Sequence, residues 1–232
     1  MLKNLLQEIQ ICANKEKAKI LSIFFQTHKG GYGEGDIFLG ITVPVQRSLS
    51  RRFKDLPLSG IETLLQSKIH EQRLIALFIL IIQYQKADKG IKEKIIRIYL
   101  KNLSSINNWD LIDSSAPYLL GNYLLTEKRE LLYKLARSKS LWARRVAIMS
   151  TYAFIKARQY DDALAVAAML LAERHDLIHK AVGWMLREIG NRDLKAERLF
   201  LDKHYKSMPR TMLRYAIEKF PQDLKKYYLD KD

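Results

Sequence analysis

Trp109 and Asp113 are the residues whose types and spacing point most directly to chemistry. They stand four positions apart in the stretch NNWDLIDSSAP, so on a helix they would share one face and could meet the same bound group. An ionised carboxylate stabilises a developing positive charge, and the electron-rich face of an indole attracts a cation by about 0.5 to 2 kcal/mol. The pair therefore predicts a site for a positively charged group. The alternative is that Trp109 packs in a core.

The residues around this pair suggest how its helix begins and ends. Asn107 or Asn108 can cap the helix, and Asp110 in the first turn suits the positive end of the helix dipole. We therefore predict that Asp110 faces away from the site and has a structural role. Pro117 lacks an N–H group and leaves the Asp113 carbonyl without its usual donor, which favours a kink that could aim the pair into a cleft.

The elements that must position this pair are helices. Apolar residues recur at helical spacing in segments such as IKEKIIRIYL and KRELLYKLARS, whereas alternating, strand-like runs are absent from the sequence. Glycine, proline and capping residues divide the chain into about a dozen helices of roughly 10 to 18 residues. The longest apolar run, Leu74 to Ile82, is about half the length that spans a bilayer, so it predicts a buried helix and no membrane association.

A repeat of about 35 residues runs along most of the chain. Aligning the segments EQRLIALFILI, NWDLIDSSAPY, WARRVAIMSTY, IHKAVGWMLRE and RTMLRYAIEKF gives intervals of 37, 35, 35 and 34 residues. The equivalent positions are Arg73, Asp110, Arg145, Lys180 and Arg214. Such a period is typical of two-helix repeats, and the missing tetratricopeptide pattern favours HEAT-like ones. We predict a single all-α solenoid domain over residues 1–232, with atypical N-terminal helices over about residues 1–40.

The charge of the chain points to an anionic partner. Forty Lys and Arg against 25 Asp and Glu give a net charge of +15, so nucleic acid is the first partner class to consider and an anionic membrane the second. Basic residues recur near the start of the second helix of successive repeats, and we predict that they form a stripe on a concave face that contacts duplex phosphates. They are Arg144, Arg145, Lys180, Arg187, Arg210 and Arg214. Each could instead be a solvated helix residue or an ion-pair partner.

Other motifs carry weaker signals. His175 and His179 in HDLIH have the spacing of a zinc protease motif, but Asp replaces the required Glu, and Asp176 is better read as an N-cap, so no metal is predicted. The glycine-rich GGYGEGD, residues 30–36, lacks the lysine of a phosphate-binding loop and predicts a structured connection between the second and third helices. The remaining histidines, His28, His70 and His204, are expected at the surface or at helix caps.

Cysteine usage and the N-terminal segment indicate an intracellular protein. Cys12 is the only cysteine, so no intrachain disulfide can form. The segment MLKNLLQEIQICANKEKAKI reads as a charged amphipathic helix, without the apolar core of a signal peptide. We expect a cytoplasmic location.

The motifs NWDLIDSSAP, LWARRVAI, HKAVGWMLREIG and MPRTMLRYAIEKF, together with YGEGDIFLGITVP, resemble the bacterial DNA alkylation repair proteins of the AlkD type. The likeness spans about residues 15 to 229 in matching order and spacing. These relatives are HEAT-like DNA glycosylases that remove cationic alkylated purines, such as N3-methyladenine and N7-methylguanine. GGYGEGD departs from the AlkD pattern, in which a shorter stretch precedes FLGI, and suggests another branch of the superfamily.

The resemblance implies roles for particular residues. The catalytic tryptophan and aspartate of the family fall on Trp109 and Asp113, a second cleft tryptophan falls on Trp184, and phosphate-contacting arginines fall on Arg145 and Arg187. A further cleft aromatic has no secure counterpart, and Phe24, Phe25 and Tyr32 are its candidates.

Three functions follow as hypotheses. The first is a monofunctional glycosylase that excises cationic alkylpurines from duplex DNA with water, needs no cofactor, and acts as a bacterial, nucleoid-associated monomer. The alternatives are a paralogue that binds damaged or branched DNA without excision and a HEAT-repeat scaffold for protein interactions. Core packing remains the alternative role for Trp184, as for Trp109.

Overall fold

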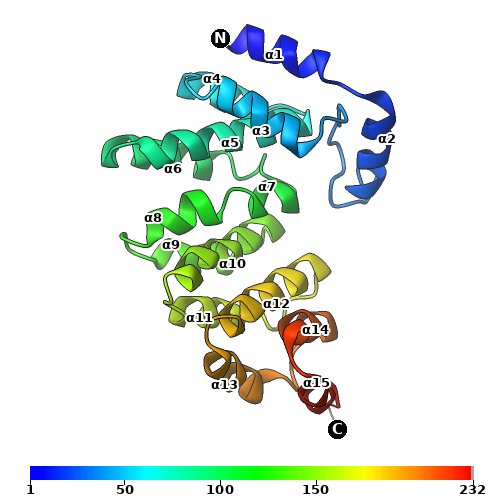
Figure 1. Ribbon diagram of the computed structural model, residues 1–232, viewed down its shortest axis with the longest axis vertical. Coiled ribbons are helices and arrows are strands. Elements are labelled where there is room, and N and C mark those ends of the chain that lie inside the picture. Colours follow the sequence, from blue (N-terminus) through cyan, green and yellow to red (C-terminus); the bar gives the residue numbers. More distant parts are fainter. Residues whose placement is uncertain (231–232) are drawn as a thin grey trace. The chain divides into compact units, whose positions relative to one another are not determined.

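A computed structural model describes residues 1–230 (Figure 1). The chain divides into two compact units, Met1–Ser115 and Ala116–Asp232. The single domain expected over residues 1–232 stays a prediction.

The first unit consists of helices around one long apolar helix. Its helices are α1 (Leu2–Ile11), α2 (Lys15–Phe24), α3 (Val43–Arg52), α4 (Leu58–Leu65), α5 (His70–Lys86), α6 (Lys89–Lys101) and α7 (Trp109–Asp113). Every residue from Leu74 to Leu80 is buried, and α3, α4 and α6 pack against α5. The buried helix predicted from this apolar run is confirmed, and among residues 1–230 no helix is long and apolar enough to cross a membrane.

Helix α2 differs from the others of this unit because none of its ten residues is buried. Asn14 caps its start by accepting from Lys17 N at 2.9 Å. The next segment approaches the same end: Asn14 N donates to Leu39 O at 2.7 Å, and Gly40, at φ +82°, lies so close that a Cβ there would stand 2.1 Å from Asn14 O. Glycine is thus needed at position 40 both for backbone conformation and for space.

The second unit continues as packed helix pairs. It holds a π-helical turn η1 (Pro117–Gly121), α8 (Asn122–Leu124), α9 (Glu130–Ala136), α10 (Leu141–Lys156), α11 (Asp161–Met169), α12 (Asp176–Gly190), α13 (Leu194–His204), α14 (Arg210–Ala216), a 3-10 turn η2 (Ile217–Lys219) and α15 (Gln222–Leu229). Helix α10 packs against α9, α11 and α12, and α12 packs in turn against α13 and α14. At Gly183 the absent side chain lets α12 approach α14, because a Cβ would stand 2.4 Å from Met212 O.

The all-α, helical-repeat fold class predicted from the sequence is confirmed. Residues 1–230 form no strand beyond an isolated bridge between Ile37 and Ile69. The equivalent basic residues of the repeat fall within the first five positions of their helices: Arg73 in α5, Arg145 in α10, Lys180 in α12 and Arg214 in α14. A concave basic face remains a prediction.

Candidate functional site

The short helix α7 presents Trp109 and Asp113 on a single turn. Asn108 caps it, as predicted, by accepting from Trp109 N at 2.8 Å. Leu111 and Ile112 are buried and hold the opposite side of the turn in the core. Helix α7 ends at Asp113, and the π-helical turn that begins at Pro117 closes with Gly121 N donating to Ala116 O at 2.8 Å. The interruption expected from Pro117 is therefore present.

All three aromatic candidates, Phe24, Phe25 and Tyr32, contact Trp109. The indole stacks on Phe25 with ring centroids 5.3 Å apart and meets Phe24 edge to face at 6.0 Å. The indole Nε1–H donates to the Tyr32 hydroxyl at 3.2 Å, and that hydroxyl donates to Phe24 O at 3.2 Å. Trp109 is half-buried and fixed both by ring contacts and by a hydrogen bond.

Asp113 lies one turn after Trp109 and is also half-buried. Its charge acts on Tyr99, which is fully buried and whose hydroxyl lies 3.2 Å from Ser115 Oγ. Burial raises the pKa of Tyr99, and the charge of Asp113 raises it further. The Asp113 carboxylate thus lies on the same turn as the Trp109 indole, and the phenol of Tyr99 stays neutral.

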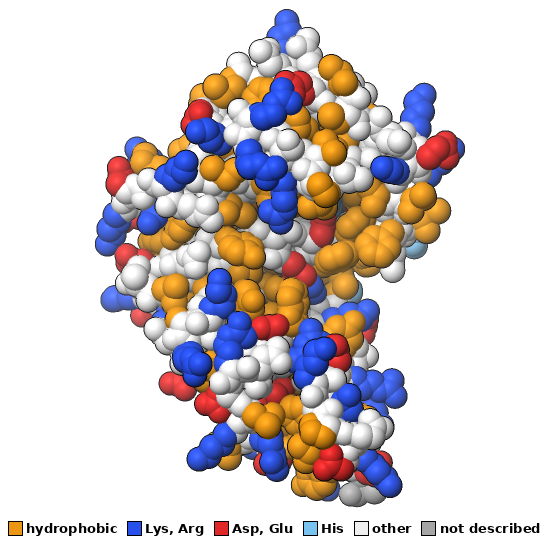
Figure 2. All heavy atoms as spheres, in the orientation of Figure 1, with side chains coloured by type: hydrophobic (Ala, Val, Ile, Leu, Met, Phe, Trp, Pro, Cys, Tyr) orange, Lys and Arg blue, Asp and Glu red, His pale blue; other side chains and the backbone are white. Residues whose placement is uncertain are grey.

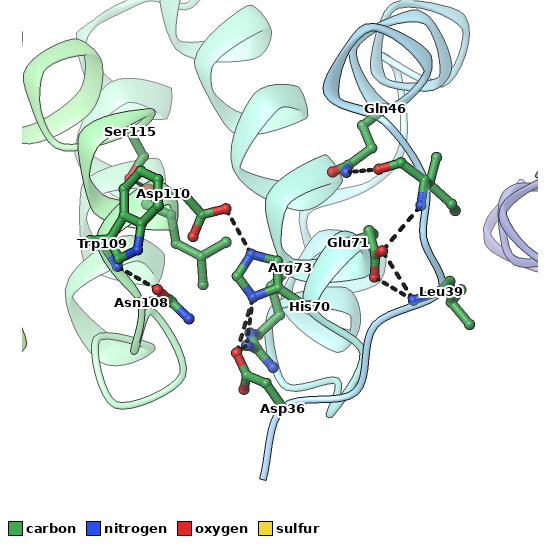
Figure 3. Close-up of polar contacts among 12 residues, drawn as sticks. Asp36, Leu39, Gln46, His70, Glu71, Arg73, Asn108, Trp109, Asp110 and Ser115 are labelled. Carbon is green, nitrogen blue, oxygen red and sulfur yellow. Dashed lines mark hydrogen bonds and ion pairs between the residues drawn. The ribbon is translucent and has the colours of Figure 1, made fainter. Parts of the chain in front are cut away.

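Asp110 belongs to a buried charged cluster formed with His70, Asp36 and Arg73 (Figure 3). His70 Nε2 lies 2.8 Å from Asp110 Oδ2, and His70 Nδ1 lies 3.0 Å from Asp36 Oδ2. Arg73 Nη2 contacts the same Asp36 oxygen at 2.6 Å. Ionised carboxylates only accept hydrogen bonds, so both ring nitrogens donate and His70 is an imidazolium.

Two sequence predictions need correction here. His70 was expected at the surface or at a cap, but it is only 1% exposed, because its charge is compensated by two carboxylates inside the unit. Asp110 does lie in the first turn of α7, but it does not simply face away to complement the helix dipole: it binds His70 at the start of α5.

The pKa shifts of the cluster agree with its geometry. Burial by itself lowers the pKa of His70, but the hydrogen bonds to Asp110 and Asp36 outweigh it and leave the pKa raised. Burial raises the pKa of Asp36, but the hydrogen bond to His70 and the charge of Arg73 outweigh it and leave the pKa lowered. With two carboxylates and two cations, the cluster is neutral overall, as its burial requires.

The glycine-rich segment 30–36 contacts both Trp109 and the buried charged cluster. It supplies Tyr32 to the indole and Asp36 to His70. Between them, Gly33 is buried so closely that a Cβ would stand 2.3 Å from Phe25 O and 3.3 Å from Asn108 Nδ2. The structured connection predicted between the second and third helices is confirmed, and its role is to tie the start of α7 to α5.

Glu71 holds the next segment, residues 39–41, against the start of α5 (Figure 3). Its buried carboxylate accepts from the backbone N–H groups of Leu39 at 3.0 Å, Gly40 at 2.8 Å and Ile41 at 3.2 Å. One carboxylate thus accepts hydrogen bonds from three successive backbone N–H groups that have no partner in a helix or strand.

Sequence reasoning missed Asp36, His70 and Glu71. The available signal was the segment IHEQR, which places three charged or titratable residues directly before an apolar run that must be buried. The partners of His70 and Glu71 are 30 to 40 positions away in the sequence, and no local pattern links them.

In the second unit, Trp184 is half-buried on α12. Its Nε1–H donates to Glu188 Oε1 at 3.2 Å, and Glu188 Oε2 also binds Arg192 at 2.7 Å. The ring centroid lies 6.5 Å from that of Tyr152. Trp184 is therefore oriented by a hydrogen bond to Glu188 on its own helix.

The predicted basic residues all lie in the second unit, and most of them bind other groups of the protein. Arg144 pairs with Glu173, Arg187 with Glu218, and Lys180 with Asp176 at 2.6 Å. Arg145 is only 4% exposed, and its guanidinium donates to Leu177 O. On the face shown in Figure 2, cationic and anionic side chains are interspersed over this unit.

Two of the predicted basic residues, Arg210 and Arg214, are exposed on α14. Arg210 donates to Leu229 O, and its exposed side chain remains accessible to a ligand. Of the six, these two and the partly exposed Lys180 are best placed to meet a phosphate without first leaving a buried partner.

Both histidines of HDLIH interact with backbone groups. His175, and not Asp176 as predicted, is the N-cap of α12, accepting from Leu177 N at 3.2 Å, and His179 Nε2 lies 2.6 Å from Glu173 O. Among residues 1–230, no three side chains of metal-binding type cluster.

Comparison with known proteins gives two matches that agree with each other. The profile of a family described as "DNA alkylation repair enzyme" matches residues 5–220. A solved structure described as "Predicted DNA alkylation repair enzyme from Enterococcus faecalis" superposes with a TM-score of 0.73 at 17% identity, covering 90% of this chain and 97% of that one. At this identity, the structural likeness concerns the fold alone. No curated protein sequence matches significantly.

Proposed function

Because the chain belongs to the DNA alkylation repair enzyme family, we propose that it is a monofunctional DNA glycosylase that excises cationic alkylated purines from duplex DNA. The observation that carries the proposal is the single turn of α7, which presents a fixed indole and a carboxylate four residues apart. The proposed catalytic residues are Asp113, Trp109 and Trp184, and no cofactor is needed.

The proposed chemistry uses the charge that the lesion already carries. The bond between C1′ and the base nitrogen breaks, and its electron pair neutralises the cationic base, so no general acid is required. Asp113 stabilises the oxocarbenium-like sugar, orients a water molecule and takes its proton as the water oxygen bonds to C1′. The faces of Trp109 and Trp184 stabilise the cationic sugar or base.

The proposed phosphate contacts come from the second unit. Lys180, Arg210 and Arg214 would bind backbone phosphates directly, and such contacts position a duplex without reading its sequence. Arg144 and Arg187 would exchange their glutamate partners for phosphate. Arg145 would have to leave its buried position, so we propose that it supports α12 more than it contacts DNA.

The proposal is tested by incubating the protein with N-methylated duplex DNA and measuring free 3-methyladenine and 7-methylguanine. We expect release above the spontaneous rate and an abasic site in the product strand. DNA binding without release would favour the non-catalytic, damage-binding alternative. Absence of both would favour a protein-interaction scaffold.

A further inference from the structure

His70 lies at the centre of a buried bridge that joins two segments of the first unit (Figure 3). Its Nε2–H donates to Asp110 on α7, and its Nδ1–H donates to Asp36 in the glycine-rich segment. Both of these segments also orient the proposed catalytic indole. Asp110 directly follows Trp109 in α7, and the glycine-rich segment supplies the Tyr32 hydroxyl that accepts from the indole Nε1–H. One imidazolium therefore connects the two segments that fix the indole.

Packed rings give a second connection between His70 and the indole. Phe25 stacks on Trp109 with centroids 5.3 Å apart, and its centroid lies 5.2 Å from that of the His70 ring. Phe38 stacks on Phe25 at 5.0 Å and on His70 at 4.4 Å. A cationic ring attracts the electron-rich face of a phenyl group more strongly than a neutral ring does. The charge of His70 thus supports the indole through ring packing as well as through hydrogen bonds.

The bridge depends on the second ring proton of His70. A neutral imidazole has one N–H group, so it can donate to only one of the two carboxylates, and the other would face a lone pair. Asp36 would keep its contact with Arg73 at 2.6 Å, whereas the second oxygen of Asp110 has no hydrogen-bond partner among residues 1–230. Loss of the proton would loosen either α7 or the glycine-rich segment, and either change would disturb the support of Trp109.

The charged groups around His70 favour its protonated form. Asp110 faces it from α7, Asp36 from the glycine-rich segment, and Arg73 from its own helix, with Nη2 3.5 Å from Nδ1. The neighbouring carboxylate of Glu71 is directed to backbone N–H groups instead. Burial lowers the pKa of His70, but the hydrogen bonds to the two carboxylates outweigh it and leave the pKa raised. The bridge is therefore intact at the ordinary histidine pKa and breaks as pH rises through the folded one.

We propose that His70 is a positioning residue for base excision: its imidazolium, held between two carboxylates, keeps the Trp109 indole in the orientation that the reaction uses. The proposal rests on the proposed glycosylase function and adds a group that acts through the indole, because His70 is only 1% exposed and does not reach the substrate. A misplacement of about 1 Å can cost about 10²-fold in rate. Duplex affinity should change little, because the proposed phosphate contacts lie in the second unit.

The pH profile of excision tests this role. Single-turnover base release by the wild type should be highest near pH 6 and fall about tenfold or more as the pH rises to 9.5, with unchanged duplex affinity. Asp110→Asn removes one of the two carboxylates that retain the proton, so its fall should occur at lower pH. His28→Gln, at an exposed position of the same unit, is the control and should keep the wild-type profile. Urea unfolding at each pH confirms that the proteins compared are folded.

His70→Gln has no titrating group at this position. Its release should be slow throughout, so the ratio of the wild-type rate to the variant rate should decrease with pH, and any titration of the DNA or of Asp113 cancels in this ratio. A constant ratio, or a fall of Asp110→Asn at the same pH as the wild type, would overturn the proposal. If His70→Gln does not fold, the comparison between the wild type and Asp110→Asn decides.

The fluorescence of Trp109 separates the positioning role from the glycosylase function. In the double variant Trp142→Phe, Trp184→Phe, Trp109 is the sole tryptophan, and its emission reports on its surroundings without DNA. If the wild type releases no base but this emission shifts with pH, and His70→Gln abolishes the shift, the positioning role stands and the glycosylase fails. If the wild type releases bases while neither rate nor emission depends on His70, the glycosylase stands and the positioning role fails.

Discussion

At the residue scale, the site combines two groups that the sequence identified with several that it did not. The i, i+4 relation of Trp109 and Asp113 could be read locally, because helix geometry fixes it. The buried state of His70 could not, because it depends on Asp36 and Asp110, which are separated from it by 34 and 40 positions. A histidine met alone in a sequence gives no sign of two distant carboxylates.

Substitution of Asp113 separates chemistry from binding. Asp113→Asn keeps the shape of the side chain but removes the charge that would stabilise the cationic sugar, so we expect excision to fall by about 10²-fold or more with DNA affinity nearly unchanged. Asp55→Asn, at an exposed position of the same unit, is the control and should keep full activity. Full activity of Asp113→Asn would show that this carboxylate is not catalytic.

Substitution of His70 tests the buried cluster. His70→Gln cannot donate to both carboxylates, and breaking a buried ion pair costs about 3 to 5 kcal/mol of unfolding free energy. The pKa of His70 is raised in the folded state, so its contribution is fully present below the unfolded pKa of about 6.5 and is lost as pH rises through the folded pKa. Urea unfolding from pH 6 to 9 should show the variant destabilised most at low pH. Equal stability, with the exposed His28→Gln as reference, would contradict this assignment.

At the element scale, the helix pairs could be predicted because apolar periodicity and the repeat interval are properties of the chain itself. The path of residues 30–41 could not, since it follows from single contacts: Gly33 against Phe25, Gly40 against Asn14, and Glu71 with three amides. The glycine-rich segment was recognised as structured, but its link to α7 came only from three-dimensional contacts.

The packing of α13 on α12 gives a prediction about stability and pH. Glu197 of α13 is 1% exposed beside Gly190, and burial raises its pKa to about 8, with the charge of Arg187 lowering it only partly. Because the folded pKa exceeds the ordinary 4.5, the folded state loses about 1.4 kcal/mol per pH unit between these values. Glu197→Gln should remove this loss and raise the melting temperature at pH 8.

The control for Glu197 is Glu130→Gln, at an exposed position of α9. It should leave the dependence of melting temperature on pH as in the wild type. If Glu197→Gln melts lower than the wild type at pH 8, the buried carboxyl stabilises the packing and the sign of the prediction is wrong.

At the scale of the whole molecule, the net charge of +15 indicated an anionic partner, but it did not show which cations are accessible. Two arginines of the predicted stripe are paired with glutamates, in the ion pairs Arg187–Glu218 and Arg144–Glu173. Side-chain pairing of this kind is set by tertiary packing, and a count of charges cannot reveal it.

The exposed arginines of α14 provide the test of duplex binding. Arg214→Ala should weaken binding to damaged and undamaged duplexes alike and reduce the slope of log affinity against log salt by about 1. The measurement is fluorescence anisotropy with a labelled duplex at several salt concentrations. Lys206→Ala, exposed after α13 and outside the predicted stripe, is the control, and an unchanged slope for Arg214→Ala would remove this residue from the DNA interface.

The measurement that tests the central claim most directly is base release under single-turnover conditions, with protein in excess over a duplex carrying 3-methyladenine or 7-methylguanine. We predict first-order release by the wild type well above the spontaneous rate, and little release by Asp113→Asn despite equal binding. Release at the spontaneous rate by a wild-type protein that binds the duplex would contradict it.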